Sequence, residues 1–381
     1  MLTNLQLQTN TISANAYCLL YRCIFEEHRR MSVVAVSAIE DVERNFPIDA
    51  LWYTRCPVPT ASGIALDLGW LAEEFDHSGI GLNSIRDSED PRVQISHFSH
   101  TLPGLFREGG NIPAIWARST GRDTVVVALT WVDEFQAILV RKDSPIEQLS
   151  DLAGRIIGVP RQTGERVDFA RAMSLRGIVT ALELAGLSTD DVALRDIESV
   201  QPAFAGASVG NGRFHELEAR ALEDGVVDAI YAKGAPGLGS ARQHGFRVLT
   251  DIGSNPDPTR RINNGNPRPV TVDRRTAELR PDIVARYLTV LIRAAEWAKD
   301  NPDAVFDIIG QEVGRTADEA RGAYGTRAHF NFGLDLSPLR RRSLAAQKDF
   351  LLRHGFIPAD FDVESWIDPR PLALATGRRE A

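Results

Sequence analysis

The chain has 381 residues, of which 43% are hydrophobic and 25% charged, and its formal net charge is −8 at pH 7. This composition is typical of a folded protein with a large core, and the length indicates two domains or one two-lobed unit. Because the negative charge is spread along the chain, nucleic acid and anionic membranes are poor candidates for partners. No run of about 18 apolar residues occurs, so no membrane-spanning helix is expected.

The first 47 residues are expected to form an N-terminal extension that is partly disordered or precedes the true start. They begin with a polar stretch, and the short apolar patch that follows is broken before it resembles an export signal, which favours a cytoplasmic location. A more natural start occurs at Met31. Three cysteines, Cys18, Cys23 and Cys56, provide no disulfide framework, and the C-x4-C spacing of the first two lacks the second ligand pair of a zinc site.

From residue 48 onward, short β-like runs alternate with helical ones. Strands are predicted at 51–56, 124–130, 136–141, 155–159, 192–196, 227–231 and 246–250, and helices at 61–74, 167–185 and 214–223. Further helices are predicted at 281–300, 302–314, 316–324 and 338–354. This alternation indicates largely parallel sheets covered by helices on both faces. Turn-rich segments at 133–144 and 253–269 are candidate linkers.

Three segments resemble the type 2 periplasmic-binding-protein folds. They are SPIEQLSDLAGRIIGVP at 144–160, LEDGVVDAIYAKG at 222–234 and PDIVARYLTVLIRAAEWAKDNPDAV at 281–305. The resemblance implies an α/β fold of two lobes, each a mainly parallel sheet flanked by helices, with a ligand cleft between the lobes. Lobe one is expected to comprise 48–153 and 265–381, and lobe two 154–264. This fold hosts binders, regulators and enzymes, so it does not determine the function.

Cys56 stands in the segment YTRCPVP, at the end of the first predicted strand. The prolines at 57 and 59 fix the backbone directly after it, so the thiol is held in one direction. In α/β sheets the carboxyl ends of the strands face the binding crevice. A catalytic thiol is one interpretation, and a small buried structural cysteine is the other.

The segment ISHFSHTLPGLFREGGNIPAIWAR at 95–118 holds the second group of candidate residues. Gly109 and Gly110 precede a predicted helix, whose free N–H groups favour an anion, and Arg107 is placed to clamp an oxyanion. A surface arginine before an ordinary turn is the alternative. His97 and His100 have metal-ligand spacing but no apparent third ligand, so a structural or hydrogen-bonding role is favoured.

Three motifs together resemble the 2'-hydroxybiphenyl-2-sulfinate desulfinase family. They are Tyr-x-x-Cys-Pro-Val-Pro, the following His-Phe and Arg-x-Gly-Gly-x-Ile-Pro. The resemblance implies an active site made of Cys56, His97, Arg107 and Gly110. Further candidate substrate-binding residues are Gly109, Thr54, His100 and, less directly, Phe214.

The chain departs from the family pattern at the expected pocket wall. His100 and Leu102 replace a tyrosine and a glutamine of the family, and Thr54-Arg55 replaces Ser-Asn. A tryptophan of the second lobe has no clear counterpart near 174–177. The reaction type is therefore better supported than the biphenyl substrate.

The chemistry of an aromatic sulfinate suits these residues. Arg107 and the Gly110 N–H would bind the sulfinate oxygens. Cys56 would either donate a proton to the ring carbon or attack the sulfur as a thiolate, with His97 orienting or polarising the thiol. An enzyme that releases sulfite in this way is expected to be a hydrolase acting on carbon–sulfur bonds. No step requires a redox cofactor, metal or nucleotide.

Two other functions fit the same fold. One is a solute-binding protein of an ABC importer for sulfonate- or nitrate-like ligands, although such a binder needs no cysteine. The other is a related lyase or decarboxylase, because the anion clamp would hold a carboxylate equally well. The expected partner is a small aromatic sulfinate. The sequence leaves the oligomeric state undetermined, with a monomer as the simplest expectation.

Overall fold

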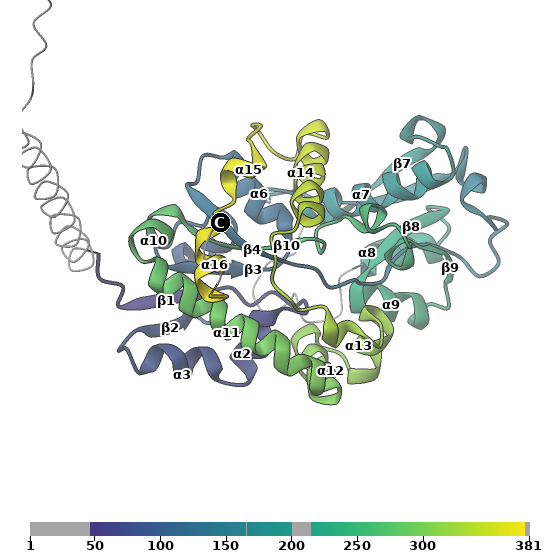
Figure 1. Ribbon diagram of the computed structural model, residues 1–381. Helices are drawn as coiled ribbons and strands as arrows, with labels where there is room; N and C mark the ends of the chain where they lie inside the picture. Colours follow the sequence, from purple (N-terminus) through teal and green to yellow (C-terminus); the bar gives the residue numbers. More distant parts are fainter. Residues whose placement is uncertain (1–45, 165, 200–214, 378–381) are drawn as a thin grey trace, which may run out of the picture. The chain divides into compact units, whose positions relative to one another are not determined.

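The computed structural model describes residues 46–164, 166–199 and 215–377, which form two sheets and the helices around them (Figure 1). The first sheet has the order β2-β1-β3-β10-β4 and the second the order β7-β6-β8-β5-β9. The strands of the first are β1 (Ala50–Tyr53), β2 (Gly81–Ser84), β3 (Leu105–Glu108), β4 (Thr124–Thr130) and β10 (Arg268–Asp273). Those of the second are β5 (Gln136–Val140), β6 (Ile156–Gln162), β7 (Ala193–Ser199), β8 (Ala229–Lys233) and β9 (Arg247–Asp251).

Each sheet is mainly parallel with one reversed strand, as the expected fold class requires. β10 is antiparallel to β3 and β4, and β5 is antiparallel to β8 and β9, whereas β1 pairs parallel with β2 and β3, and β6 pairs parallel with β7 and β8. The chain enters the second sheet through β5 and returns to the first through β10. Since β5 precedes residue 154, the second sheet begins earlier in the chain than the expected lobe boundary. Both sheets belong to one compact unit that begins at Ile48.

Helices pack on both sheets. Around the first sheet are α2 (Ala61–Asp67), α3 (Trp70–Asp76), α6 (Asn111–Ser119) and α10 (Arg274–Leu279), followed by α11 (Pro281–Asp300), α12 (Pro302–Val313), α13 (Ala317–Tyr324), α14 (Pro338–Arg353), α15 (Val363–Trp366) and α16 (Arg370–Ala375). Around the second are α7 (Phe169–Leu184), α8 (Glu216–Glu223) and α9 (Gly234–Gln243), and the short α4 (Pro91–Gln94) and α5 (Ser96–Ser99) lie before β3. None of the helices in the described ranges combines the length and apolarity that a bilayer crossing requires.

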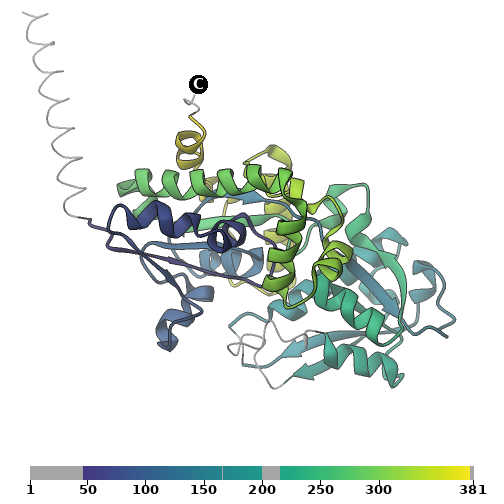
Figure 2. The same ribbon diagram turned by 90° about the horizontal axis from the view of Figure 1, so that it is seen from below.

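The long helix α11 fixes the first sheet from one side (Figure 2). Its apolar residues share a core with β1, β3, β4 and β10. Tyr287 of α11 stacks on Phe106 of β3, with ring centroids 3.9 Å apart and ring planes 11° apart. Because neighbouring side chains of a strand point to opposite faces, this contact turns Arg107 to the other side of the sheet.

The differences from the predicted elements have local causes. The helix predicted at 61–74 is interrupted between α2 and α3, where Gly69 adopts a left-handed conformation with φ +73°. β3 and β10 were not predicted, because their charged residues obscure the apolar pattern although the strands are buried. The N-terminal extension, with Cys18 and Cys23, lies outside the described residues except for its last two positions.

Candidate active site

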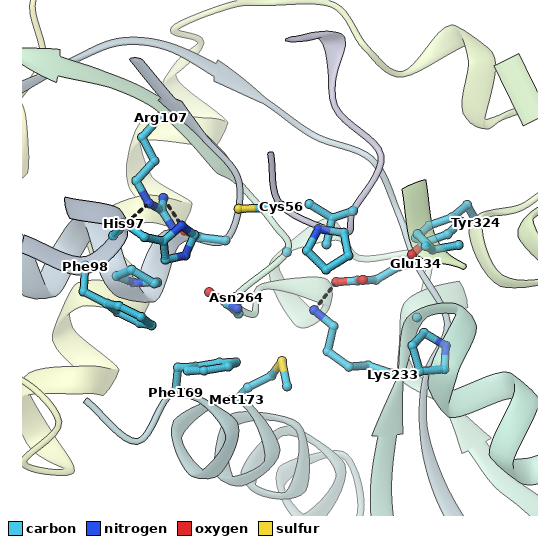
Figure 3. A pocket seen from close by; sticks show the side chains of 18 residues that line it. Cys56, His97, Phe98, Arg107, Glu134, Phe169, Met173, Lys233, Asn264 and Tyr324 are labelled. Atoms are coloured by element: carbon cyan, nitrogen blue, oxygen red, sulfur yellow. Dashed lines mark hydrogen bonds and ion pairs between the residues drawn. The ribbon is translucent and has the colours of Figure 1, made fainter. Parts of the chain in front are cut away.

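A cavity of about 110 Å³ is lined by residues of both sheets and of the segments that connect them (Figure 3). The first sheet and its helices contribute Cys56, Pro57, Val58, His97, Phe98, Arg107, Gly110 and Pro113. The second contributes Phe169, Met173, Lys233, Gly234 and Pro236, and the connecting segments contribute Glu134, Asn264 and Gly265. Val313 and Tyr324 complete the wall. Four of the residues implied by the family resemblance, namely Cys56, His97, Arg107 and Gly110, therefore meet at one cavity.

Cys56 lies three residues beyond β1 and only 8% of it is exposed. The turn is held by a hydrogen bond of 2.8 Å from Val58 N to Cys56 O. A β-carbon added to Gly109 would lie 2.5 Å from Cys56 Sγ and 3.2 Å from Cys56 Cβ. Gly109 thus provides the surface against which the thiol rests, and its contact with the substrate stays a prediction.

Arg107 is 1% exposed and has no carboxylate partner among the described residues. Its Nε donates to His97 O at 3.2 Å, and its Nη1 donates to Gly110 O at 2.8 Å. Burying a cation without a counter-ion is costly. The remaining guanidinium donors at the cavity are thus suited to an anionic ligand.

The start of α6 differs from the free anion site predicted from the glycine pair. Asn111 N donates to Asn264 O at 2.8 Å, and Ile112 N donates to Asn264 Oδ1 at 3.0 Å. A β-carbon on Gly110 would lie 2.5 Å from the same Oδ1, so the glycine admits the Asn264 side chain. These N–H groups are already satisfied by the connecting segment. Within the described chain, Gly110 N–H remains without a hydrogen bond and can join Arg107 in binding an anion.

The cysteine and histidine at the cavity are both neutral. Burial raises the pKa of the Cys56 thiol, although Arg107 acts in the opposite direction. Burial also holds the pKa of His97 well below its usual range, and the charge of Arg107 adds to this effect. Figure 3 shows Cys56, His97 and Arg107 on the same side of the cavity. The resting site therefore contains a thiol and an imidazole, not a thiolate–imidazolium pair.

Two expected substrate contacts support the site from behind and do not line the cavity. Thr54 Oγ1 donates to Glu108 O at 3.5 Å, and its backbone N donates to Phe106 O at 3.1 Å. His100 ends α5 in a left-handed conformation with φ 49°, and its Nε2 lies 3.1 Å from Leu105 O. Burial lowers the pKa of His100 to about 4. Phe214 lies outside the described residues.

The apolar wall of the cavity was not predicted. It is formed by Phe98, which follows His97 directly, and by Phe169 and Met173 at the start of α7. The rings of Phe98 and Phe169 are 6.3 Å apart, and those of His97 and Phe98 are in edge contact at 4.9 Å. Such a wall suits an aryl group. The signal in the sequence was the spacing of Phe169 and Met173, which puts both on one face of the predicted helix.

The opposite end of the cavity is polar and was also not predicted. Lys233, the last residue of β8, forms an ion pair of 2.6 Å with Glu134 of the segment before β5. Tyr324, at the end of α13, lies beside them (Figure 3). These residues come from three separate segments, and no local motif connects them.

No protein-family model matches the sequence. The chain is 28% identical over 364 residues to the 2'-hydroxybiphenyl-2-sulfinate desulfinases of Rhodococcus erythropolis and Rhodococcus qingshengii, covering 87% of this chain and 94% of each relative. A crystal structure of a cysteine-to-serine mutant of DszB in complex with biphenyl-2-sulfinic acid matches with a TM-score of 0.69 and 26% identity, covering 87% of this chain and all of that one. The periplasmic aliphatic sulphonate binding protein SsuA of Escherichia coli matches with a TM-score of 0.61 and 19% identity, covering 84% of this chain and 92% of that one, and thus shares the fold. The chain therefore resembles the aromatic sulfinate desulfinases in sequence and structure, on the two-lobed fold of periplasmic binding proteins.

Proposed function

We propose that the protein is a desulfinase that cleaves the carbon–sulfur bond of an aromatic sulfinate, either 2'-hydroxybiphenyl-2-sulfinate or a related arylsulfinate, and releases sulfite. The observation that carries the proposal is a buried arginine, Arg107, without a carboxylate partner in the described chain, at a cavity that also holds the neutral thiol of Cys56. The similarity to the desulfinases over 87% of the chain supports the same reaction.

The cavity offers separate binding sites for the sulfinate and for the aryl group of the substrate. The sulfinate oxygens accept hydrogen bonds from the guanidinium of Arg107 and from Gly110 N–H. The aryl group packs against the wall formed by Phe98, Phe169 and Met173. In this arrangement the ring carbon that carries the sulfur faces the side of the cavity on which Cys56 lies (Figure 3).

Cys56 then acts as the proton donor. The thiol proton passes to the ring carbon and forms a C–H bond with the electron pair of the breaking C–S bond, so that sulfur leaves as neutral sulfur dioxide and Cys56 is left as a thiolate. Water converts sulfur dioxide to bisulfite and supplies the proton that restores the thiol. One water is consumed per turnover, which makes the reaction a hydrolysis of a carbon–sulfur bond.

The electrostatics of the site favour proton donation over nucleophilic attack. Burial already keeps the proton on Cys56, and a bound sulfinate anion raises the thiol pKa further. A nucleophilic cysteine would need to lose its proton, but the pKa of His97 is too low for a strong general base. The role left to His97 is to orient the thiol.

A panel of arylsulfinates, with sulfite release as the readout, tests the proposal. The unaltered protein should release sulfite, and Cys56→Ser should abolish release while it keeps arylsulfinate affinity within about tenfold, or roughly 1.4 kcal/mol. Intact-protein mass spectrometry during turnover should show no adduct on Cys56. An adduct would replace the proton-donor mechanism by nucleophilic attack. Binding without any sulfite release would indicate a solute-binding protein instead.

A further inference from the structure

The ion pair at the polar end of the cavity is not used in the proposed reaction. Lys233 Nζ lies 2.6 Å from Glu134 Oε1, and the two side chains are 9% and 1% exposed. Figure 3 shows Lys233 reaching into the cavity from the side opposite Arg107 and His97, with Glu134 above it. The pair therefore faces the part of a bound aryl group that points away from the sulfinate.

The backbone around the pair is shaped to hold it. A β-carbon on Gly265 would overlap with Glu134 Oε1 and would lie 3.3 Å from Lys233 Nζ. Gly234 adopts a left-handed conformation with φ +61°, which favours glycine, and a β-carbon there would make an ordinary contact of 3.4 Å with Glu134 Oε2. The absence of a side chain at Gly265 therefore makes room for the Glu134 carboxylate beside Lys233.

Stability alone does not explain this pair. A buried ion pair loses hydration on both partners, and apolar residues of similar size are often as stable or more so. The pair also keeps unused hydrogen-bonding capacity, since an ammonium has three donors and a carboxylate about four acceptor positions. Glu134 is the ion-pair partner of the Lys233 ammonium, and within residues 46–164, 166–199 and 215–377 the buried Glu134 Oε1 makes no hydrogen bond.

We propose that Lys233 and Glu134 together bind a hydroxyl group on the aryl portion of the substrate, remote from the sulfinate, and so determine which arylsulfinates the enzyme selects. This inference rests on the proposed desulfinase function. The hydroxyl accepts a hydrogen bond from Lys233 Nζ and donates one to the Glu134 carboxylate.

The hydrogen-bonding groups of the pair favour a hydroxyl over a charged substituent. The Lys233–Glu134 pair is neutral as a unit, and the buried Arg268 adds a positive charge near Lys233, so an ammonium on the substrate would be repelled. A carboxylate would be attracted by Lys233 but would lie against the Glu134 carboxylate, to which it has no proton to donate. A group that both donates and accepts satisfies both partners without displacing either. An aryl group without such a substituent would leave the pair desolvated and without a third partner, which costs affinity.

The test compares biphenyl-2-sulfinate with its singly hydroxylated isomers. The unaltered protein should favour the best-placed hydroxylated isomer over the parent compound by at least about tenfold in kcat/KM. The double variant Lys233→Met/Glu134→Leu, which avoids leaving one buried charge alone, should reduce this ratio to about one. The matched control is Lys348→Met, which removes a lysine paired with Asp360 outside the cavity, and it should keep the ratio of the unaltered protein.

Several results would overturn the inference. The unaltered protein could show no preference among the isomers, or the double variant could lose activity equally on all of them. Dissociation constants of the same isomers, measured on Cys56→Ser, test the role of the pair separately from the proposed reaction. A retained hydroxyl preference in binding, without sulfite release by the unaltered protein, would refute the desulfinase reaction but not the role of the pair.

Discussion

The contact between Gly109 and the Cys56 thiol provides the sharpest test of the site. In Gly109→Ala the new β-carbon would lie 2.5 Å from Cys56 Sγ and 3.2 Å from Cys56 Cβ. Non-bonded carbon and sulfur atoms are comfortable only at about 3.5–4.0 Å, so the thiol has to move by about 1 Å. The turn cannot absorb this shift easily, because Pro57 fixes its backbone and Val58 N is hydrogen-bonded to Cys56 O.

The expected effect is mainly on the rate of the chemical step. A misplacement of about 1 Å in a reacting group costs roughly 100-fold in rate, which corresponds to about 2.7 kcal/mol. Arg107 Nη2 would lie 4.0 Å from the new β-carbon, an ordinary contact, so the anion site should remain intact. We therefore expect kcat to fall about 100-fold while KM changes little. Overpacking should also lower the free energy of unfolding by about 1–3 kcal/mol.

Sulfite release and urea unfolding measure the two effects separately. Gly333→Ala is the matched control, since a β-carbon there meets no atom within 4 Å, and it should leave kcat, KM and stability unchanged. A kcat of Gly109→Ala within threefold of that of the unaltered protein would refute the reasoning that the thiol packed against Gly109 is the reacting group. The reasoning would equally fail if KM rose and kcat did not change.

Two further predictions concern Arg107 and His100. Arg107→Lys should cost about 2–3 kcal/mol in kcat/KM, because a compact ammonium lacks the planar fork that reaches the His97 and Gly110 carbonyls and the sulfinate at the same time. Values within a few-fold of the unaltered protein would place Arg107 outside the reaction. Burial lowers the pKa of His100 from 6.5 to about 4, so the unfolded state binds more protons as the pH falls. The protein should therefore lose about 2 kcal/mol of unfolding free energy between pH 7 and pH 5 from this residue. His100→Asn, which tolerates the left-handed conformation, should lose that much less over the same interval, and equal losses in urea titrations at the two pH values would contradict this.

The elements predicted correctly are those whose burial follows from a regular spacing of apolar residues along the chain. β4 and α11 have the predicted bounds, because a run of buried β-branched residues and a 20-residue amphipathic face identify themselves. β3 was missed because Arg107 and Glu108 look like surface residues. Glu108 is buried because Ala61 N, Ser62 N and Thr130 Oγ1 donate to its carboxylate, and no local pattern shows partners so far away in the chain.

The candidate site divides in the same way. Its cysteine, histidine, arginine and glycine stand in two short motifs, whose residue types already indicated an anion and a thiol. The polar end is assembled by the sheet instead. Gln136 of β5 pairs in register with Lys233 of β8, and this pairing brings Glu134 and Lys233 together across about a hundred residues of chain. Residue spacing cannot predict such a contact, because it depends on the strand order.

The positive charge of Arg107 explains how a fold that binds anions can also support cleavage of a carbon–sulfur bond. While the sulfinate is bound, its negative charge offsets that of Arg107, and burial keeps the proton on Cys56. In the proposed reaction sulfur leaves as a neutral molecule, so the guanidinium loses this counter-ion and the Cys56 thiolate is the new anion that forms at the cavity. The charge that held the substrate then stabilises the product state of the cysteine, so binding and proton transfer draw on the same residue. A simple binding protein needs only the binding of the anion by Arg107. In the proposed reaction, the Cys56 thiol that rests on Gly109 adds the proton transfer.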